Sequence, residues 1–325
     1  MHRGEVPIVG GLAMFLGVVC GMGLLPLSDA AGGAFLAACA VLVITGLLDD
    51  RFDLSPWARL PVQIAAAIVL IFGAGSVVTT LGDPFGTGPM TLEGLGAHAF
   101  TILIVVAAIN AFNMLDGMDG LAGTTSVVAL AALAYLAGTS GLTVPLMASL
   151  VLAGAVCAFL IFNLPIRFNR TSRCFMGDAG STLLGFSLAW LCINVSQGSV
   201  KAAAPVTTLW ILALPLYELV WTTVRRTIRG ISPFKADDNH FHHLLLKAGF
   251  GVRGAFVILV VLAALLASLG VVGEKIGMPE HISFLLLALM GVGTVRLMYR
   301  AELIWKLLPA SREGMKTLTV AEESE

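Results

Sequence analysis

The sequence predicts an all-α, polytopic integral membrane protein. Of its 325 residues, 58% are hydrophobic and 12% are charged, whereas about 25% charged residues are typical of a soluble domain. Ten apolar segments approach the roughly 20 residues that a helix needs to cross a bilayer. The lysines and arginines lie almost entirely in alternate connections between these segments, which is typical of membrane proteins with a fixed orientation.

The ten predicted spans divide the whole chain into helices and short connections. We expect one transmembrane domain over residues 1–325, in which residues 310–325 form a loose cytoplasmic tail. In chain order, the spans cover residues 8–27, 32–48, 60–80, 97–115, 122–139, 143–163, 180–197, 203–223, 255–272 and 281–298.

Basic residues set the expected orientation. With ten spans, 17 of the 19 lysines and arginines fall on the side of the N-terminus, and only Lys201 and Lys275 fall on the other. Positive charge gathers on the cytoplasmic side, so both termini are expected there. A net charge of −1 argues against nucleic acid as the main partner. The lipid bilayer is the environment that the composition indicates.

Eight aspartates from four separate connections fall on the same predicted side as the basic residues. Acids that gather at one face from distant parts of a chain indicate a single polar site at that interface. We therefore expect the active site at the cytoplasmic face. The eight are Asp49, Asp50, Asp53, Asp116, Asp119, Asp178, Asp237 and Asp238.

A regular series of polar residues closes the fourth predicted span. Asn110, Asn113, Asp116 and Asp119 recur every three residues after an uncharged run. Three residues turn a helix about 60° short of a full circle, so the four cannot share one face of a straight helix. We expect the helix to end near Gly117 and Gly120, so that the four side chains converge.

Two further motifs carry acids. Asp49 and Asp50 follow the second span, and adjacent carboxylates suit proton transfer or the sharing of a cation, although an Asp-Asp pair can also simply end a helix. Asp178 lies between glycines before the seventh span, where backbone N–H groups and a carboxylate could hold a phosphate and its Mg²⁺. The alternative for this motif is an ordinary helix N-cap at Asp178 or Ser181.

The long connection after the eighth span combines arginines and histidines. We expect the arginines to meet a phosphate headgroup at the membrane surface and the histidines to donate to a phosphate or sugar. A basic amphipathic interface helix is the alternative, and Glu218, within the span, is left without a role. The residues are Arg225, Arg226, Arg229, His240, His242 and His243.

Arginines in the connection before the seventh span have two interpretations. Arg167, Arg170 and Arg173 are either topology signals or phosphate ligands, and topology alone explains them adequately.

Five motifs in this order resemble those of the polyprenyl-phosphate N-acetylhexosamine-1-phosphate transferases. Within that family the chain is most similar to the bacterial undecaprenyl-phosphate N-acetylglucosamine-1-phosphate transferases. The family normally has one more span before the first motif, and this sequence begins at Met1, within that motif. The motifs are HRGEVPIVGG, LLDDRFDL, NAFNMLDGMDGLAG, FMGDAGSTLLGF and RRTIRGISPFKADDNHFHHLLLKAGF.

The resemblance implies a role for each matching residue. It implies that Asp49 and Asp50 are the catalytic acid pair and that Asn113 and Asp178 hold the metal. Nucleotide-sugar and phosphate binding is implied for Asp116, Asp119, Arg225, Arg226, Arg229, His240, His242 and His243.

The resemblance also implies a reaction and its setting. N-acetylglucosamine-1-phosphate would pass from UDP-N-acetylglucosamine to undecaprenyl phosphate, releasing UMP and initiating a lipid-linked glycan such as O-antigen. Mg²⁺ is the expected cofactor, with Mn²⁺ as an alternative, and the bacterial inner membrane is the expected location. Another UDP-N-acetylhexosamine as donor, or an ion-coupled transporter in place of an enzyme, are the alternatives. A homo-oligomer is compatible with the sequence.

Overall fold

A computed structural model describes residues 6–23, 30–164, 172–232 and 239–307, with side chains as far as residue 300. The expected tail at 310–325, and Arg167, Arg170, Asp237 and Asp238, lie outside the described residues. Apart from an isolated bridge between Thr80 and Thr91, the regular secondary structure of the described residues is helical. The helices are α1 (Gly10–Gly23), α2 (Ala30–Phe52), α3 (Pro56–Ala74), α4 (Gly94–Leu115), α5 (Leu121–Thr139), α6 (Thr143–Asn163), α7 (Gly177–Ser196), α8 (Pro205–Ile211), α9 (Ala213–Ile228), α10 (Phe241–Lys247), α11 (Val252–Lys275) and α12 (Glu280–Leu307).

Every predicted apolar segment contains a helix or a pair of helices. Among the described residues, eight helices are long and apolar enough to cross a membrane, namely α2 to α7, α11 and α12. The segment 203–223 contains the pair α8 and α9, which could form a ninth span, and 8–27 contains the shorter apolar α1. The helices confirm a polytopic membrane protein, whereas the total of ten spans and their orientation stay predictions.

The pair α8 and α9 is bent by 79°. Pro215 explains the position of this break, because proline has no N–H to donate to the carbonyl of Ile211, four residues earlier. The backbone between the two helices turns at Leu212, whose φ and ψ are −100° and 15°. The bend gives α9 a direction that a continuous span over 203–223 would not have.

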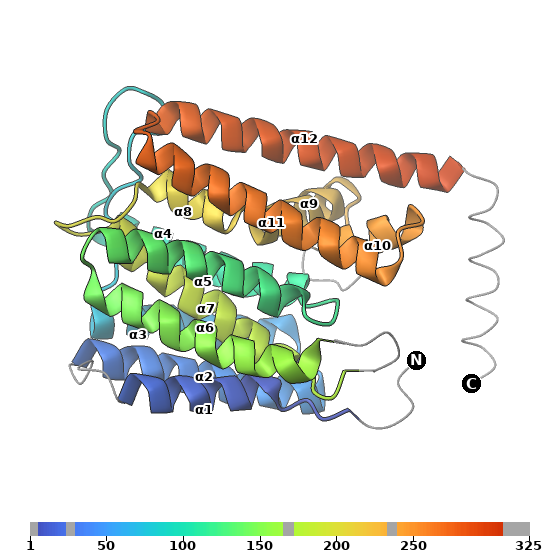
Figure 1. Ribbon diagram of the computed structural model, residues 1–325, viewed down its shortest axis with the longest axis horizontal. Coiled ribbons are helices and arrows are strands. Elements are labelled where there is room, and N and C mark those ends of the chain that lie inside the picture. Colours follow the sequence, from blue (N-terminus) through green and yellow to red (C-terminus); the bar gives the residue numbers. More distant parts are fainter. Residues whose placement is uncertain (1–5, 24–29, 165–171, 233–238, 308–325) are drawn as a thin grey trace.

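The long helices lie roughly side by side in one bundle, with α12 at one outer edge and α1 and α2 at the opposite edge (Figure 1). In the centre, α7 packs against α1, α2, α4, α5, α6 and α8, and 94% of its most apolar 18-residue window is buried. The connection between α4 and α5 lies at the same end of the bundle as α10 (Figure 1). This end is called the site end below.

Two glycines allow α2 and α4 to pack closely against α7. A Cβ atom added to Gly46 of α2 would lie 2.3 Å from the Cα atom of Ala179, and one added to Gly185 of α7 would lie 2.6 Å from the Cα atom of Ile109 in α4. Small residues at such crossings let helix backbones touch in a membrane protein. Both crossings lie one or two helical turns from the polar ends of α2 and α4, which are thereby brought to the start of α7.

Candidate active site

The two adjacent aspartates at the end of α2 have different partners. Asp49 Oδ2 accepts a hydrogen bond of 2.6 Å from Arg59 Nη1, and its Oδ1 accepts one of 2.8 Å from the backbone N–H of Leu54. Asp50 Oδ1 instead accepts from the backbone N–H of Asp178, at 2.8 Å. Successive helical residues point about 100° apart, which explains the divergence. The acid pair therefore contains one carboxylate that is ion-paired with Arg59, Asp49, and one, Asp50, that accepts from the backbone of α7.

Asn113 of α4 and Asp178 of α7 are in direct contact. The side-chain amide of Asn113 donates to Asp178 Oδ1 and, at 3.1 Å, to Ser181 Oγ. Arg59 Nη1 lies 3.8 Å from Asp178 Oδ2. The N-cap of α7 is Met176, not Asp178 or Ser181. The N–H of Asp178, expected to face a phosphate, is occupied by a carboxylate of α2 in this structure.

The turn after α4 is held by a residue that the sequence did not single out. Asn163, buried at the end of α6, accepts a hydrogen bond of 2.6 Å from the N–H of Gly120 and donates one of 2.8 Å to the carbonyl of Cys174. Ser172 Oγ, which has one proton to donate, lies within hydrogen-bond distance of both the Asp119 carboxylate and the carbonyl oxygen of Asn163. Like Asn113, Asn163 is a polar residue at the end of an apolar run, and this pattern could have predicted that Asn163 belongs to the site.

The polar series at the end of α4, Asn110, Asn113, Asp116 and Asp119, is called the α4 series. Its four side chains converge only in part. Asn113 and Asp116 lie together, but Asp119 turns to Ser172, and Asn110 donates 2.8 Å bonds to Gln63 Oε1 and to the carbonyl of Val106. As expected, α4 ends directly before Asp116. Gly120 has a φ of 78°, in the left-handed region that favours glycine.

Gly117 was expected to let the chain turn, but in the structure its missing side chain makes room for a histidine. A Cβ atom added there would lie 2.3 Å from Cε1 of His242, so the glycine leaves room for the imidazole ring of α10. His242 is buried, and its ring centroid lies 4.0 Å from that of His243 and 5.9 Å from that of His240. Burial, followed by the charges of His243 and His240, lowers the pKa of His242 to about 3. The His242 ring is therefore neutral at neutral pH.

Negative charge dominates the environment of Asp116. Burial is the largest cause that raises the pKa of its carboxyl well above the usual 3.8, followed by the charges of Asp178, Asp119 and Asp50. Unbalanced negative charge of this kind is typical of a site that receives a cation or a proton.

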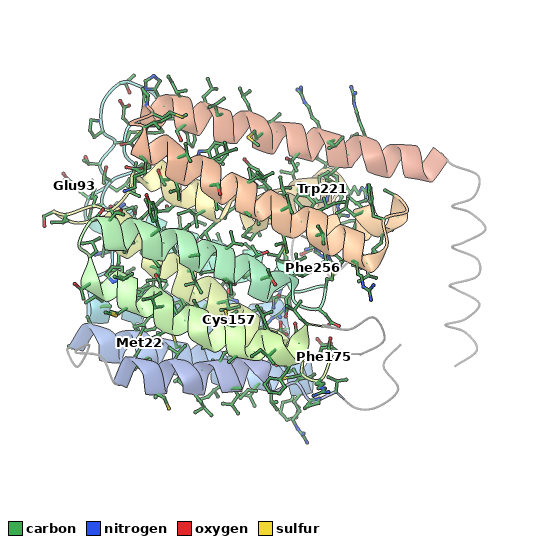
Figure 2. The ribbon with its side chains drawn as sticks, viewed as in Figure 1. Met22, Glu93, Cys157, Phe175, Trp221 and Phe256 are labelled. Carbon is green, nitrogen blue, oxygen red and sulfur yellow. The ribbon has the colours of Figure 1, made fainter. Side chains whose placement is uncertain are left out.

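The three arginines of α9 and its C-terminus point in different directions. Arg226 is buried and lines a groove with the histidines, whereas Arg225 lies over the ring of Trp221, 5.7 Å from its centroid, and faces α12. Arg229 is exposed at the C-terminus of α9. Figure 2 shows Trp221 in this region, between α11 and α12 in the view. Of the three, Arg226 is the one placed to meet a ligand in the groove.

Glu218 pairs with a histidine. Its Oε1 lies 2.8 Å from His240 Nδ1, and its Oε2 accepts a hydrogen bond of 2.9 Å from the backbone N–H of Phe241. The carboxylate is buried inside α9, with 1% of its side chain exposed.

Two cavities meet at the site end. A cavity of about 370 Å³ is lined by acids and the start of α7, including Asp50, Asp119, Phe175 and Asp178. A groove of about 520 Å³ is lined by Arg59, Gln63, Asn110, Arg226 and the three histidines, together with apolar residues of α4 and α9. Asn113, Asp116 and Gly117 line both. Figure 2 shows Phe175 at this end and Glu93 at the other.

A family model matches the part of the chain that contains the acids of the site. The model of glycosyl transferase family 4 matches residues 33–196, half of the chain. The chain belongs to glycosyl transferase family 4. The residues that match the family 4 model contain both acids of α2, the α4 series and Asp178. Arg226 and the three histidines of the groove lie beyond them, whereas Arg59 lies within them.

Curated relatives bear the same name. An undecaprenyl-phosphate alpha-N-acetylglucosaminyl 1-phosphate transferase of Escherichia coli (strain K12) is 40% identical over 273 residues, which are 84% of this chain and 74% of that protein. The protein of that name from Yersinia pestis is 38% identical over 289 residues, 89% of this chain and 79% of its own. That of Pasteurella multocida (strain Pm70) is 37% identical over 283 residues, 87% and 79%. These relatives confirm the family resemblance inferred from the motifs, and the chain is a membrane-embedded family 4 glycosyl transferase.

Proposed function

We propose that the protein transfers N-acetylglucosamine-1-phosphate from UDP-N-acetylglucosamine to undecaprenyl phosphate, releasing UMP and initiating a lipid-linked glycan such as O-antigen. One observation carries this proposal: two chemically different cavities share Asn113, Asp116 and Gly117. A transferase must bring two substrates to one point, and the shared wall provides that point.

The groove suits the lipid phosphate. Arg59 and Arg226 supply positive charge, and Leu103, Val106 and Leu219 supply an apolar wall. Leu103 is 62% exposed, so the groove reaches the outer surface of the bundle. An acceptor with a prenyl chain in the bilayer can therefore bring its phosphate into the groove from the side, with its oxygens toward the arginines.

The acidic cavity suits a nucleotide diphosphate that carries a cation. A diphosphate is repelled by Asp50, Asp116 and Asp178 unless positive charge accompanies it. Buried Asp50 Oδ2 has no hydrogen-bond partner among the described residues, so the cavity contains an unused oxygen ligand. Mg²⁺ is the proposed cofactor and Mn²⁺ the alternative, because these ions prefer carboxylate, amide and water oxygens.

Asn113 and Asp178 are the proposed metal-holding residues. Within the described part of the chain, no three histidine, cysteine or acidic side chains are gathered as a metal site. Mg²⁺ usually takes only one or two carboxylates from the protein and keeps its waters, so the set fits this ion. When bound, it would offset the charge of the diphosphate and of the leaving UMP.

In the proposed reaction, an oxygen of the lipid phosphate forms a bond to the sugar-linked phosphorus. The bond from that phosphorus to the oxygen shared with UMP breaks, and UMP keeps the electron pair. A phosphate monoester has a second pKa of about 6, so the acceptor carries little proton at neutral pH. Asp50 is placed to orient the reacting groups or to take the residual proton, while Asp49 is occupied by Arg59.

The proposed setting is the bacterial inner membrane with both termini in the cytoplasm. Arg59, Arg226, Lys247 and Arg253 belong to the site end, whereas Lys201 lies in the connection between α7 and α8 at the other end. Positive charge marks the cytoplasmic side of such proteins. The site would then face the compartment of the nucleotide sugar.

An assay with purified protein tests the proposal. The protein is given undecaprenyl phosphate and a panel of UDP-sugars, and UMP is measured with and without Mg²⁺. We expect UMP release to require UDP-N-acetylglucosamine, the lipid and the cation together. Release from another UDP-N-acetylhexosamine alone would correct the donor, and no lipid-dependent release from any sugar would contradict the function.

A further inference from the structure

The buried carboxylate of Glu218 lies outside the two cavities but contacts one of the groove residues. It is 1% exposed, and a carboxylate buried within an apolar helix is costly unless donors compensate its charge. Three donors lie within reach: His240 Nδ1 at 2.8 Å, the N–H of Phe241 at 2.9 Å and Thr222 Oγ1 at 3.4 Å. Two of the three belong to the segment that carries the histidines.

This contact joins α9 to the start of α10. Trp221 Nε1, one turn further along α9, donates a hydrogen bond of 3.1 Å to the carbonyl of Asn239. Residues 239–241 are therefore held by α9 at three points, two of them on Glu218. The histidine segment is fixed relative to Arg226, which extends from the same helix into the groove.

The hydrogen bond between Glu218 and His240 determines which nitrogen of His240 meets a ligand. A carboxylate only accepts hydrogen bonds, so Nδ1 of His240 must carry a proton toward Glu218. The ring lines the groove with 14% of its side chain exposed. In the neutral ring Nε2, on the opposite edge, then carries no proton, so it is the nitrogen that can accept a proton from a phosphate in the groove.

We propose that Glu218 is the positioning residue of the groove: it fixes the tautomer and orientation of His240 so that the unprotonated Nε2 faces the phosphate of the lipid acceptor and can take its residual proton. This inference rests on the transferase function proposed above. It separates Glu218 from the residues that touch substrate, because the carboxylate acts only through His240 and the backbone of α10.

The decisive variant is Glu218→Gln. The amide oxygen can still accept from the N–H of Phe241, so α10 keeps its anchor, while the amide NH₂ donates to Nδ1, which favours the tautomer with the ring proton on Nε2. Glu274→Gln is the matched control. Glu274 accepts from the N–H of Ala204 at 2.9 Å and from Thr207 Oγ1 at 2.5 Å, and so also bridges a backbone and a side chain, but far from the groove.

The first readout is spectroscopic and does not depend on activity. The ¹⁵N spectrum of histidine-labelled protein, in which His240→Asn identifies the signal among the six histidines, should show His240 protonated at Nδ1. In Glu218→Gln the proton should move to Nε2, and in Glu274→Gln it should stay. An Nε2-protonated His240 in the wild type would overturn the proposal, even if Glu218→Gln failed to fold.

The second readout is kinetic. Glu218→Gln should lower kcat/KM for undecaprenyl phosphate by about 10-fold or more, leave the KM for UDP-N-acetylglucosamine within about twofold, and have little further effect in a His240→Asn background. Full additivity of the two substitutions, or an equal loss in Glu274→Gln, would overturn the positioning role. A wild-type protein without UMP release but with the expected spectrum would contradict the proposed function and not the contact.

Discussion

The backbone N–H of Asp178 donates a 2.8 Å hydrogen bond to Asp50 Oδ1, which joins the start of α7 to the end of α2. The side chain of Asp178 is held separately, by the amide of Asn113. Its carboxylate is thus oriented by α4 while its backbone is oriented by α2. Substitutions at this residue can therefore remove the charge and preserve the position.

Asp178→Asn tests the metal proposal. The variant keeps an oxygen for Asn113 and the backbone bond to Asp50 but loses the charge that would hold Mg²⁺. We expect Mg²⁺-dependent UMP release to fall by at least about 100-fold, with an unchanged circular dichroism spectrum and membrane insertion. Turnover at the wild-type rate would show that the metal is held elsewhere.

Asp49→Asn tests whether the first acid of α2 is mainly a structural anchor. Asp49 is 3% exposed at its side chain and pairs with Arg59, so the substitution removes the charge at 2.6 Å and leaves the guanidinium only its longer contact of 3.8 Å with Asp178. We expect a loss of about 1–3 kcal/mol in the free energy of unfolding. The double variant Asp49→Asn, Arg59→Gln should be less destabilised than the sum of the single variants. Simple additivity would show that the ion pair is not the source of the loss.

Asp116→Asn tests the excess negative charge. The raised pKa of Asp116 means that the folded protein binds this proton more tightly than the unfolded chain. The contribution of the group to stability is present below its unfolded pKa of 3.8 and is lost as the pH rises through its folded pKa. The uncharged variant should therefore have a higher Tm than the wild type at pH 8, and a smaller advantage at pH 4. Melting curves at both values in metal-free buffer measure this, and an equal difference at both would contradict it.

Gly117→Ala tests the contact between the α4–α5 connection and α10. The added Cβ atom would overlap the ring of His242, which is buried and cannot simply move away. We expect about a tenfold or greater loss of kcat/KM, because misplacement of site groups by about 1 Å is costly. Gly96→Ala is the control, since nothing lies within 4 Å of its added Cβ atom. If both variants behave alike, close packing at Gly117 is not required.

Asn163→Ala tests the residue that supports the turn after α4. The substitution removes the acceptor for the N–H of Gly120 and the donor to the carbonyl of Cys174. Leaving such buried groups unpaired should cost about 1–3 kcal/mol, and Tm measurements would show it. Asn194→Ala is the comparison: it removes a 2.8 Å bond to the carbonyl of Trp190 in its own helix and a 3.2 Å bond to Ser76 Oγ. It should cost less, because it leaves no backbone N–H without an acceptor.

The fold was largely predictable from the sequence. Apolar runs of about 20 residues have few alternatives in a bilayer, so the ten segments and the helices coincide. The bend between α8 and α9 was not predicted, although Pro215 could have indicated it. Hydropathy averages over a window and does not record which carbonyl loses its donor.

The site was predictable in composition and less so in geometry. The motifs predicted that Asn113, Asp116 and Asp178 lie at the same face of the membrane, and the structure brings them together at the site end. Arg59 was only one of the 17 basic residues that set the predicted orientation, because its pairing with Asp49 depends on the angle between α2 and α3. The use of Gly117 likewise depends on a ring 125 residues away, which no local pattern reveals.

The wall shared by the two cavities has a thermodynamic consequence. Asn113 and Asp116 contribute to both, so a ligand that shifts either side chain in one cavity alters the free energy of binding in the other. Such coupling is reciprocal. If bound lipid changes the affinity for the nucleotide sugar by some factor, bound nucleotide sugar changes the affinity for the lipid by the same factor. An inhibitor designed for one cavity would therefore have a potency that depends on the concentration of the substrate in its neighbour.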